Sequence, residues 1–107
     1  MSNRRFIPRL RRRVRLTLKD AGPVFTADLS PGGFAAELLQ VPRPGTTLHG
    51  TLPLGGQEFP FTGVVMWAKA GELRLNLRGR VGVRFTGIAN AYFEAYQRAA
   101  LPPARGA

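Results

Sequence analysis

The stretch Gln57–Ala68, which reads QEFPFTGVVMWA, is the longest strand that alternating polarity predicts in this chain, and it decides the fold class. Successive side chains of a strand point to opposite faces of its sheet, so residues two apart share a face. Four apolar residues share the face that we expect to point into the core: Phe59, Phe61, Val65 and Trp67. Val64 and Met66 lie on the other face. Apolar residues on both faces are typical of a central strand, which we expect here.

Shorter alternating segments flank this strand on both sides. They span residues 13–19, 24–30, 34–39 and 46–54 before it, and 73–77 and 80–86 after it. Turn residues separate them: Asp20-Ala21-Gly22-Pro23, Pro31-Gly32-Gly33, Val41-Pro42-Arg43-Pro44-Gly45, Gly55-Gly56 and Lys69-Ala70-Gly71-Glu72. The first two segments are expected to form a hairpin. In the second of them the core face is expected to hold Phe25, Ala27 and Leu29. The opposite face is expected to hold Thr26, Asp28 and Ser30.

The chain ends in a different pattern. Asn90 is placed to cap a helix, and Pro102-Pro103 would end it. Three aromatic residues follow at helical spacing: Tyr92, Phe93 and Tyr96. Seven short strands and one helix predict an all-β fold, a closed or nearly closed antiparallel barrel capped by the helix. We expect an arginine-rich arm at residues 1–12, the barrel and helix at 13–101 and a short tail at 102–107.

The charge of the chain is strongly positive and concentrated at one end. The 107 residues carry 16 Lys plus Arg against 6 Asp plus Glu, a net charge of +10, and 14 of the cations are arginines. Seven arginines stand in the first fifteen residues, without an acid between them: Arg4, Arg5, Arg9, Arg11, Arg12, Arg13 and Arg15. The planar guanidinium suits bidentate contacts to phosphate and guanine, so we expect an anionic partner and an arm that is mobile without it.

Several classes of protein are excluded. The length allows a single domain, and the absence of cysteine excludes disulfides and thiolate metal sites. No apolar run reaches the roughly 20 residues of a membrane helix, which favours a cytoplasmic protein without membrane insertion. His49 is the only histidine and is expected on a strand surface, and the six acids form no close pair. We therefore expect no catalytic residues, no metal site and no enzyme activity.

Two short segments carry more specific information. In Arg5-Phe6-Ile7-Pro8-Arg9 two arginines stand four residues apart in a stretch where proline disfavours a helix. Asp28-Leu29-Ser30-Pro31-Gly32-Gly33 follows at the end of a strand. Alone, the first is most simply a basic tail and the second a turn in which Gly33 takes a positive φ. Together they combine arginines for phosphate and base with a carboxylate that can accept hydrogen bonds from guanine N1 and N2.

The order Arg-x-x-x-Arg, eighteen intervening residues and Asp-x-Ser-x-x-Gly resembles the PilZ domain, the bacterial receptor module for cyclic di-GMP. The resemblance extends through Val64-Val65-Met66-Trp67 and Gly82-Val83-Arg84-Phe85, and so covers nearly the whole chain. It implies a six- or seven-stranded antiparallel barrel with the ligand on its outer surface. It needs no other cofactor.

The resemblance also implies roles for individual residues. Arg5 and Arg9 would hold phosphate and guanine, Asp28 and Ser30 would bond to a guanine edge or the ligand backbone, and Gly33 would let the ligand approach the main chain. Arg4, just before the first motif arginine, implies an intercalated ligand dimer. Binding would order the arm, and the changed surface would be recognised by a protein partner that the sequence does not identify.

Two other functions fit the same residues. One is a small barrel that binds nucleic acid through its basic arm and a second basic stripe: Arg74, Asn76, Arg78, Arg80 and Arg84. Against it, the aromatic residues that would stack on bases are expected in the core: Phe25, Phe59, Phe61, Trp67 and Phe85. The other is a PilZ-like adaptor that binds no ligand, which the intact motif disfavours.

Overall fold

The computed structural model describes residues 13–19 and 21–100. The predicted arm at residues 1–12 and tail at 102–107 lie outside these residues, and with them Arg4, Arg5 and Arg9. None of the helices in the described part is long and apolar enough to cross a membrane.

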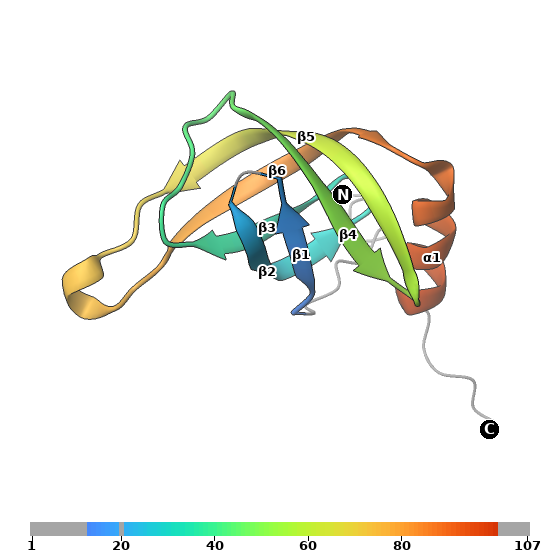
Figure 1. Cartoon of the computed structure of the whole chain (residues 1–107), viewed down its shortest axis with the longest axis horizontal. Coiled ribbons are helices and arrows are strands. Elements are labelled where there is room, and N and C mark those ends of the chain that lie inside the picture. Colours follow the sequence, from blue (N-terminus) through green and yellow to red (C-terminus); the bar gives the residue numbers. More distant parts are fainter. Residues whose placement is uncertain (1–12, 20, 101–107) are drawn as a thin grey trace, which may run out of the picture.

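Six strands form one closed antiparallel barrel in the order β1-β2-β3-β6-β5-β4, and a single α-helix follows (Figure 1). The elements are β1 (Arg15–Leu18), β2 (Gly22–Ser30), β3 (Gly33–Leu38), β4 (Thr47–Leu54), β5 (Gln57–Lys69), β6 (Gly79–Ile88) and α1 (Asn90–Ala100). The long strand β5 pairs with β4 on one side and β6 on the other, as expected for a central strand. The predicted all-β barrel with a C-terminal helix is confirmed.

The expected strand at residues 73–77 is wrong. Residues Leu73–Leu75 form a 3-10 helix, and one isolated bridge joins Glu72 to Leu77. Asn76 has a φ of 58°, in the left-handed region, which interrupts an extended conformation. The segment therefore closes the end of the long β5–β6 hairpin instead of adding a seventh strand.

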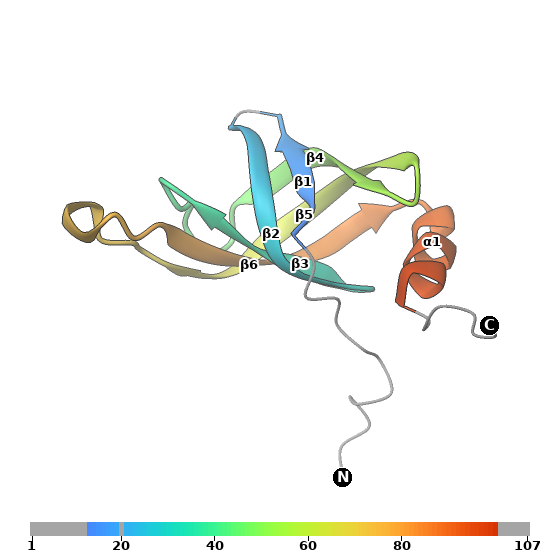
Figure 2. The ribbon, with the colours of Figure 1, turned by 90° about the horizontal axis from the view of Figure 1, so that it is seen from below.

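The strands of the barrel and the helix together supply the core. Fully buried side chains come from five strands: Leu16, Leu29, Leu52, Val65 and Val81. At the end covered by α1, aromatic rings pack edge to face, with centroid distances of 5.5 Å between Phe61 and Phe85 and 5.3 Å between Phe85 and Tyr92. Such pairs add to the hydrophobic free energy of burial. The helix thus closes one end of the barrel (Figures 1 and 2).

The alternation in β2 changes phase, so the expected core position of Phe25 is wrong. The register with β3 passes from Thr26↔Ala36 to Asp28↔Ala35, which leaves Ala27 as an additional residue, a β-bulge. Before the bulge Thr26 points into the core, and Phe25 lies outside with 40% of its surface exposed. The Thr26 hydroxyl accepts a hydrogen bond of 3.0 Å from the N–H of Val14. This bond satisfies the buried hydroxyl inside the barrel.

A second bulge makes the expected core position of Trp67 wrong for the same reason. The register with β6 passes from Val65↔Val83 to Trp67↔Gly82, so Met66 is the additional residue. Val65 and Val83 point inward, and the phase change places Trp67 on the outside with 46% of its surface exposed. Phe59 and Phe61, which precede the bulge, are buried as expected.

Candidate ligand-binding site

A row of four directly opposed residues crosses the outer face of the barrel. Asp28 on β2 pairs with Ala35 on β3, Ala35 pairs with Gly82 on β6, and Gly82 pairs with Trp67 on β5. Directly opposed residues of antiparallel strands point to the same face. The two small residues in the middle form a low floor between the carboxylate of Asp28 and the indole of Trp67. A carboxylate and an aromatic ring thus face one outer strip of the sheet.

The next row lies beside the first and carries the end of the predicted motif. Ser30 pairs with Gly33, Gly33 pairs with Arg84, and Arg84 pairs with Val64. The residues of the two rows, apart from Val64, line an open hollow of about 240 Å³, to which Met66 also contributes. The structure therefore brings the predicted Asp28, Ser30 and Gly33 together and adds Trp67 and Arg84. The described residues do not include Arg4, Arg5 and Arg9, and their positions relative to the hollow remain predictions.

Ser30 holds the turn between β2 and β3. Its hydroxyl donates a hydrogen bond of 3.1 Å to the carbonyl of Gly33. The N–H of Phe85 donates a bond of 2.8 Å to the carbonyl of Gly32, which attaches this turn to β6. The motif serine thus shapes the backbone next to the hollow, as the turn interpretation of the sequence expected.

Gly33 is required by the close approach of β6. It is not one of the glycines with positive φ, so the left-handed conformation expected for a simple turn is wrong at this position. A Cβ built on Gly33 would lie 1.9 Å from the carbonyl oxygen of Val83, which is backbone and cannot move aside cheaply. Close packing against β6 therefore explains why this position holds a glycine. The contact between Gly33 and the ligand stays a prediction.

Trp67 is the feature of the hollow that the sequence pattern missed. A Cβ on Gly82 would lie 2.0 Å from Nε1 of Trp67, so the indole lies directly over this glycine. Because Gly82 has no side chain, the ring can lie against the floor with its outer face open to a ligand. Alternation alone places Trp67 in the core, and only the bulge at Met66 brings it into the site.

Two tyrosines of α1 hold the end of β2 from inside the barrel. The Tyr92 hydroxyl donates a hydrogen bond of 2.6 Å to the carbonyl of Ser30, and the Tyr96 hydroxyl donates one of 3.3 Å to the carbonyl of Leu29. Burial, and secondarily the neighbouring Tyr96, raises the pKa of Tyr92 well above its usual value. The helix and the site are thus connected through buried hydrogen bonds to the backbone.

This connection predicts a loss of stability at alkaline pH. Tyr92 ionises near pH 10 in the unfolded chain but only at higher pH in the folded protein, so its contribution is complete below pH 10 and is lost above it. The free energy of unfolding should fall by up to about 1.4 kcal/mol per pH unit above pH 10 from this group. Tyr92→Phe should lower stability by about 1–2 kcal/mol at pH 7 and flatten the alkaline decline. Urea unfolding between pH 7 and 11 measures both, and an equally steep decline in Tyr92→Phe would contradict the assignment.

Two further expectations from the sequence concern His49 and metal ligands. His49 is exposed on β4, as expected. Within residues 13–19 and 21–100, no group of three His, Cys, Asp or Glu side chains could hold a metal ion.

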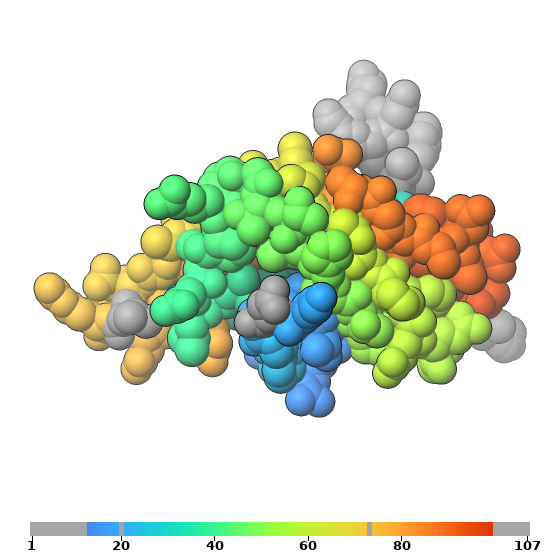
Figure 3. Space-filling view, turned by 45° about the horizontal axis from the view of Figure 1, so that its top comes forward, coloured from blue at the N-terminus to red at the C-terminus, as the bar shows by residue number. Residues whose placement is uncertain are grey.

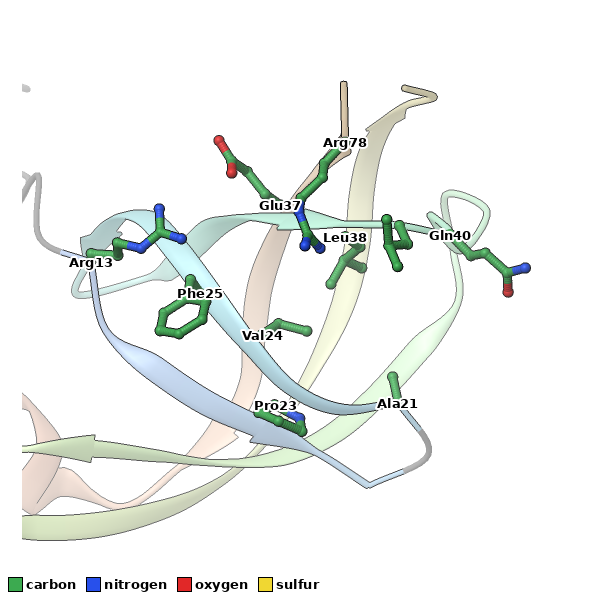
Figure 4. Close-up of a pocket in the computed structure, with 10 residues that line it drawn as sticks. Arg13, Ala21, Pro23, Val24, Phe25, Glu37, Leu38, Gln40 and Arg78 are labelled. Atoms are coloured by element: carbon green, nitrogen blue, oxygen red, sulfur yellow. The ribbon is translucent and has the colours of Figure 1, made fainter. Parts of the chain in front are cut away.

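A second, larger hollow of about 530 Å³ opens beside the hairpin of β1 and β2 (Figure 4). Phe25, exposed by the first bulge, lies there under the guanidinium of Arg13, whose Cζ is 4.5 Å from the ring centre. Leu38 and Arg78 also line it. Of the predicted site residues, the three that the structure describes, Asp28, Ser30 and Gly33, do not line it.

The chain is a small six-stranded barrel domain with a carboxylate, an aromatic ring and an arginine on its outer face. The family model of the PilZ domain matches residues 3–100, and the chain belongs to this family. Among solved structures it is similar to the Bacillus subtilis inhibitor of motility, MotI/DgrA, with a TM-score of 0.77 and 15% sequence identity. The match covers 92% of this chain and 50% of that protein, so this chain spans about half of its length. None of the curated proteins matches the chain.

Proposed function

We propose that this PilZ domain is a cytoplasmic receptor for cyclic di-GMP and not an enzyme, and that it transmits ligand binding to a protein partner. The observation that carries the proposal is the outer row of Asp28, Ala35, Gly82 and Trp67, which places an acceptor and an aromatic ring on either side of a flat floor. A purine base fits such a strip because its face stacks on an aromatic ring while its edge forms hydrogen bonds.

Each residue then has a chemical role. Asp28 accepts hydrogen bonds from N1 and N2 of one guanine, and the indole of Trp67 stacks on a base. Arg84 contributes a positive charge beside the floor. Arg5 and Arg9 grip phosphate and the Hoogsteen edge of guanine, and Ser30 and Gly33 shape the backbone at the ligand. Arg4 favours a second, intercalated ligand molecule.

The ligand is expected to act as a switch through the arm. An arginine-rich segment repels itself in isolation, and a doubly anionic ligand offsets that repulsion with charge-assisted hydrogen bonds. The entropy lost when the arm becomes ordered is compensated only in the complex. The ordered arm then presents a surface that a partner recognises.

Isothermal titration with cyclic di-GMP tests the proposal, with GMP and a mixed-sequence oligonucleotide as controls at two salt concentrations. Trp67 is the only tryptophan, so its fluorescence reports on the same hollow without a label. We expect selective binding that persists at the higher salt and changes the Trp67 emission. The stoichiometry distinguishes one ligand from two. Binding of the oligonucleotide alone would contradict the proposal.

Asp28→Asn should weaken cyclic di-GMP binding by roughly 10- to 100-fold, because a hydrogen bond to a charged acceptor contributes about 1.5–3 kcal/mol. Glu58→Gln, an acid-to-amide change at an exposed position of β5, is the matched control and should leave the affinity unchanged. Calorimetry measures both, and thermal unfolding checks that Asp28→Asn retains the fold. Equal affinities of the two variants would remove Asp28 from the site.

One observation also favours nucleic acid as a second candidate. The expectation that aromatic residues are unavailable for stacking is wrong for Phe25 and Trp67, since both are exposed on the outer face. Arg80 on β6 and Lys69 on β5 are directly opposed, and they lie on the same outer face as Trp67. Binding through such a face depends steeply on salt, which the two salt concentrations of the titration detect.

A further inference from the structure

The closing segment of the β5–β6 hairpin, residues 70–78, projects beyond the barrel. Figures 1 and 2 show it at the end of the molecule opposite α1, and Figure 3 shows it as a narrow knob. We call residues 70–78 the tip. The proposed ligand site does not include it, so a function for the tip is independent of that site.

The tip combines exposed leucines with arginines. Leu75 is 66% exposed and Leu77 is 56% exposed, although both are large apolar residues. Arg74 and Arg78 flank them and are exposed as well. Isolated exposed leucines are common, but two within three residues on a projecting knob with cations on both sides indicate a surface that meets an apolar and anionic partner.

The backbone of the tip is already hydrogen-bonded within itself. The N–H of Glu72 donates to the carbonyl of Leu77 at 2.9 Å, and the N–H groups of Leu75 and Leu77 donate to the carbonyl of Glu72 at 3.0 Å. A Cβ on Gly71 would lie 2.2 Å from the carbonyl oxygen of Leu77, so the two sides of the knob are in close contact at its base. These bonds lower the free-energy cost of moving the tip out of water, because the backbone N–H and carbonyl groups that they join keep their hydrogen-bond partners.

The base of the tip carries unbalanced positive charge. Lys69 and Arg80 are directly opposed across β5 and β6, an arrangement that is destabilising for like charges. Glu37 lies 3.5 Å from Arg80, with both side chains partly exposed. Residues 69–80 contain four cations and one acid, which leaves a net charge of +3. An anionic surface would offset this repulsion.

We propose that the tip docks on an anionic lipid bilayer, with Leu75 and Leu77 in the headgroup region and the flanking cations on lipid phosphates. Apolar residues bordered by arginines are typical of segments that lie in the membrane interface. A stable protein interface buries about 800 Å² on each partner and matches its shape, which a narrow convex knob of nine residues does not supply alone. A bilayer accepts such a knob without a preformed groove. The cytoplasmic leaflet provides the negative charge.

A single fluorescent label tests the proposal directly, because the chain has no cysteine. Leu75→Cys carries an environment-sensitive NBD group at the tip, and Gln57→Cys carries the same group on the exposed start of β5, at the α1 end. Both proteins are mixed with vesicles of phosphatidylglycerol and phosphatidylcholine, and with phosphatidylcholine alone, near physiological salt. This design separates insertion of the tip from adsorption of the arginine-rich arm, which both proteins share.

We expect a blue shift, and quenching by nitroxide lipids, only at position 75 and only on the anionic vesicles. An unlabelled Leu75→Ser, Leu77→Ser double variant should partition roughly tenfold less, because two apolar side chains no longer leave water. The control Leu39→Ser, which changes an exposed leucine outside the tip, should match the parent protein. Vesicle binding with position 75 still in water, a shift at both labelled positions, a shift on phosphatidylcholine alone, or no vesicle binding would each overturn the proposal.

Discussion

Val65→Asp is expected to abolish the folded state at room temperature. Val65 is only 1% exposed and points into the centre of the barrel from β5, the strand that pairs with both β4 and β6. An aspartate there must either carry a buried charge without a counterion or bury a protonated carboxyl group, and both are costly. A cost of about 4–5 kcal/mol or more approaches the whole free energy of unfolding of a small domain, which is about 5–15 kcal/mol.

Circular dichroism and thermal unfolding measure this effect, and Met66→Asp is the matched control. Met66 is the next residue on the same strand, but it is the additional residue of the bulge and is 53% exposed. The same substitution there should change the free energy of unfolding by less than about 1 kcal/mol, since exposed substitutions rarely cost more. Similar losses at both positions would contradict the phase of β5 described above.

Arg9→Ala is expected to reduce cyclic di-GMP affinity by roughly 100-fold or more while the fold is retained. The guanidinium of Arg9 is expected to form two charge-assisted hydrogen bonds to the anionic ligand, each worth about 1.5–3 kcal/mol. The substitution by alanine removes both bonds. Arg9 lies outside the described residues and precedes β1 in the sequence, so circular dichroism and thermal unfolding check that the variant keeps the fold. Titration calorimetry measures the affinity and Trp67 fluorescence reports on the occupied hollow.

Arg43→Ala is the control for charge. Arg43 is an exposed arginine in the loop between β3 and β4, and its removal lowers the net charge of the protein by the same amount. We expect its affinity for cyclic di-GMP to stay within about twofold of the parent, because Arg43 does not line the hollow and salt weakens the effect of an exposed charge. If Arg9→Ala and Arg43→Ala weaken binding equally, the arginine motif acts only through net charge and the receptor proposal fails.

The two bulges show where prediction from sequence was limited. Alternation correctly placed Leu29, Phe59, Phe61 and Val65 in the core, because each lies in a stretch of strand with an uninterrupted period of two. It placed Phe25 and Trp67 wrongly, because the additional residue at Ala27 or Met66 shifts the alternation, so that residues on its two sides do not follow one common period of two. Nothing in the local composition of either segment marks the bulge, since its position depends on the length and curvature of the paired strands.

The sequence by itself determined the barrel, the C-terminal helix and the grouping of Asp28, Ser30 and Gly33, because alternation, turn residues and motif spacing are local properties of the chain. Only the tertiary structure decided that Trp67 faces Asp28 across Ala35 and Gly82, that Gly33 is a contact point with β6, and that residues 70–78 form an exposed tip. These features depend on pairing between strands that are far apart in sequence. The register of such pairs follows from closing the barrel as a whole and not from any one segment.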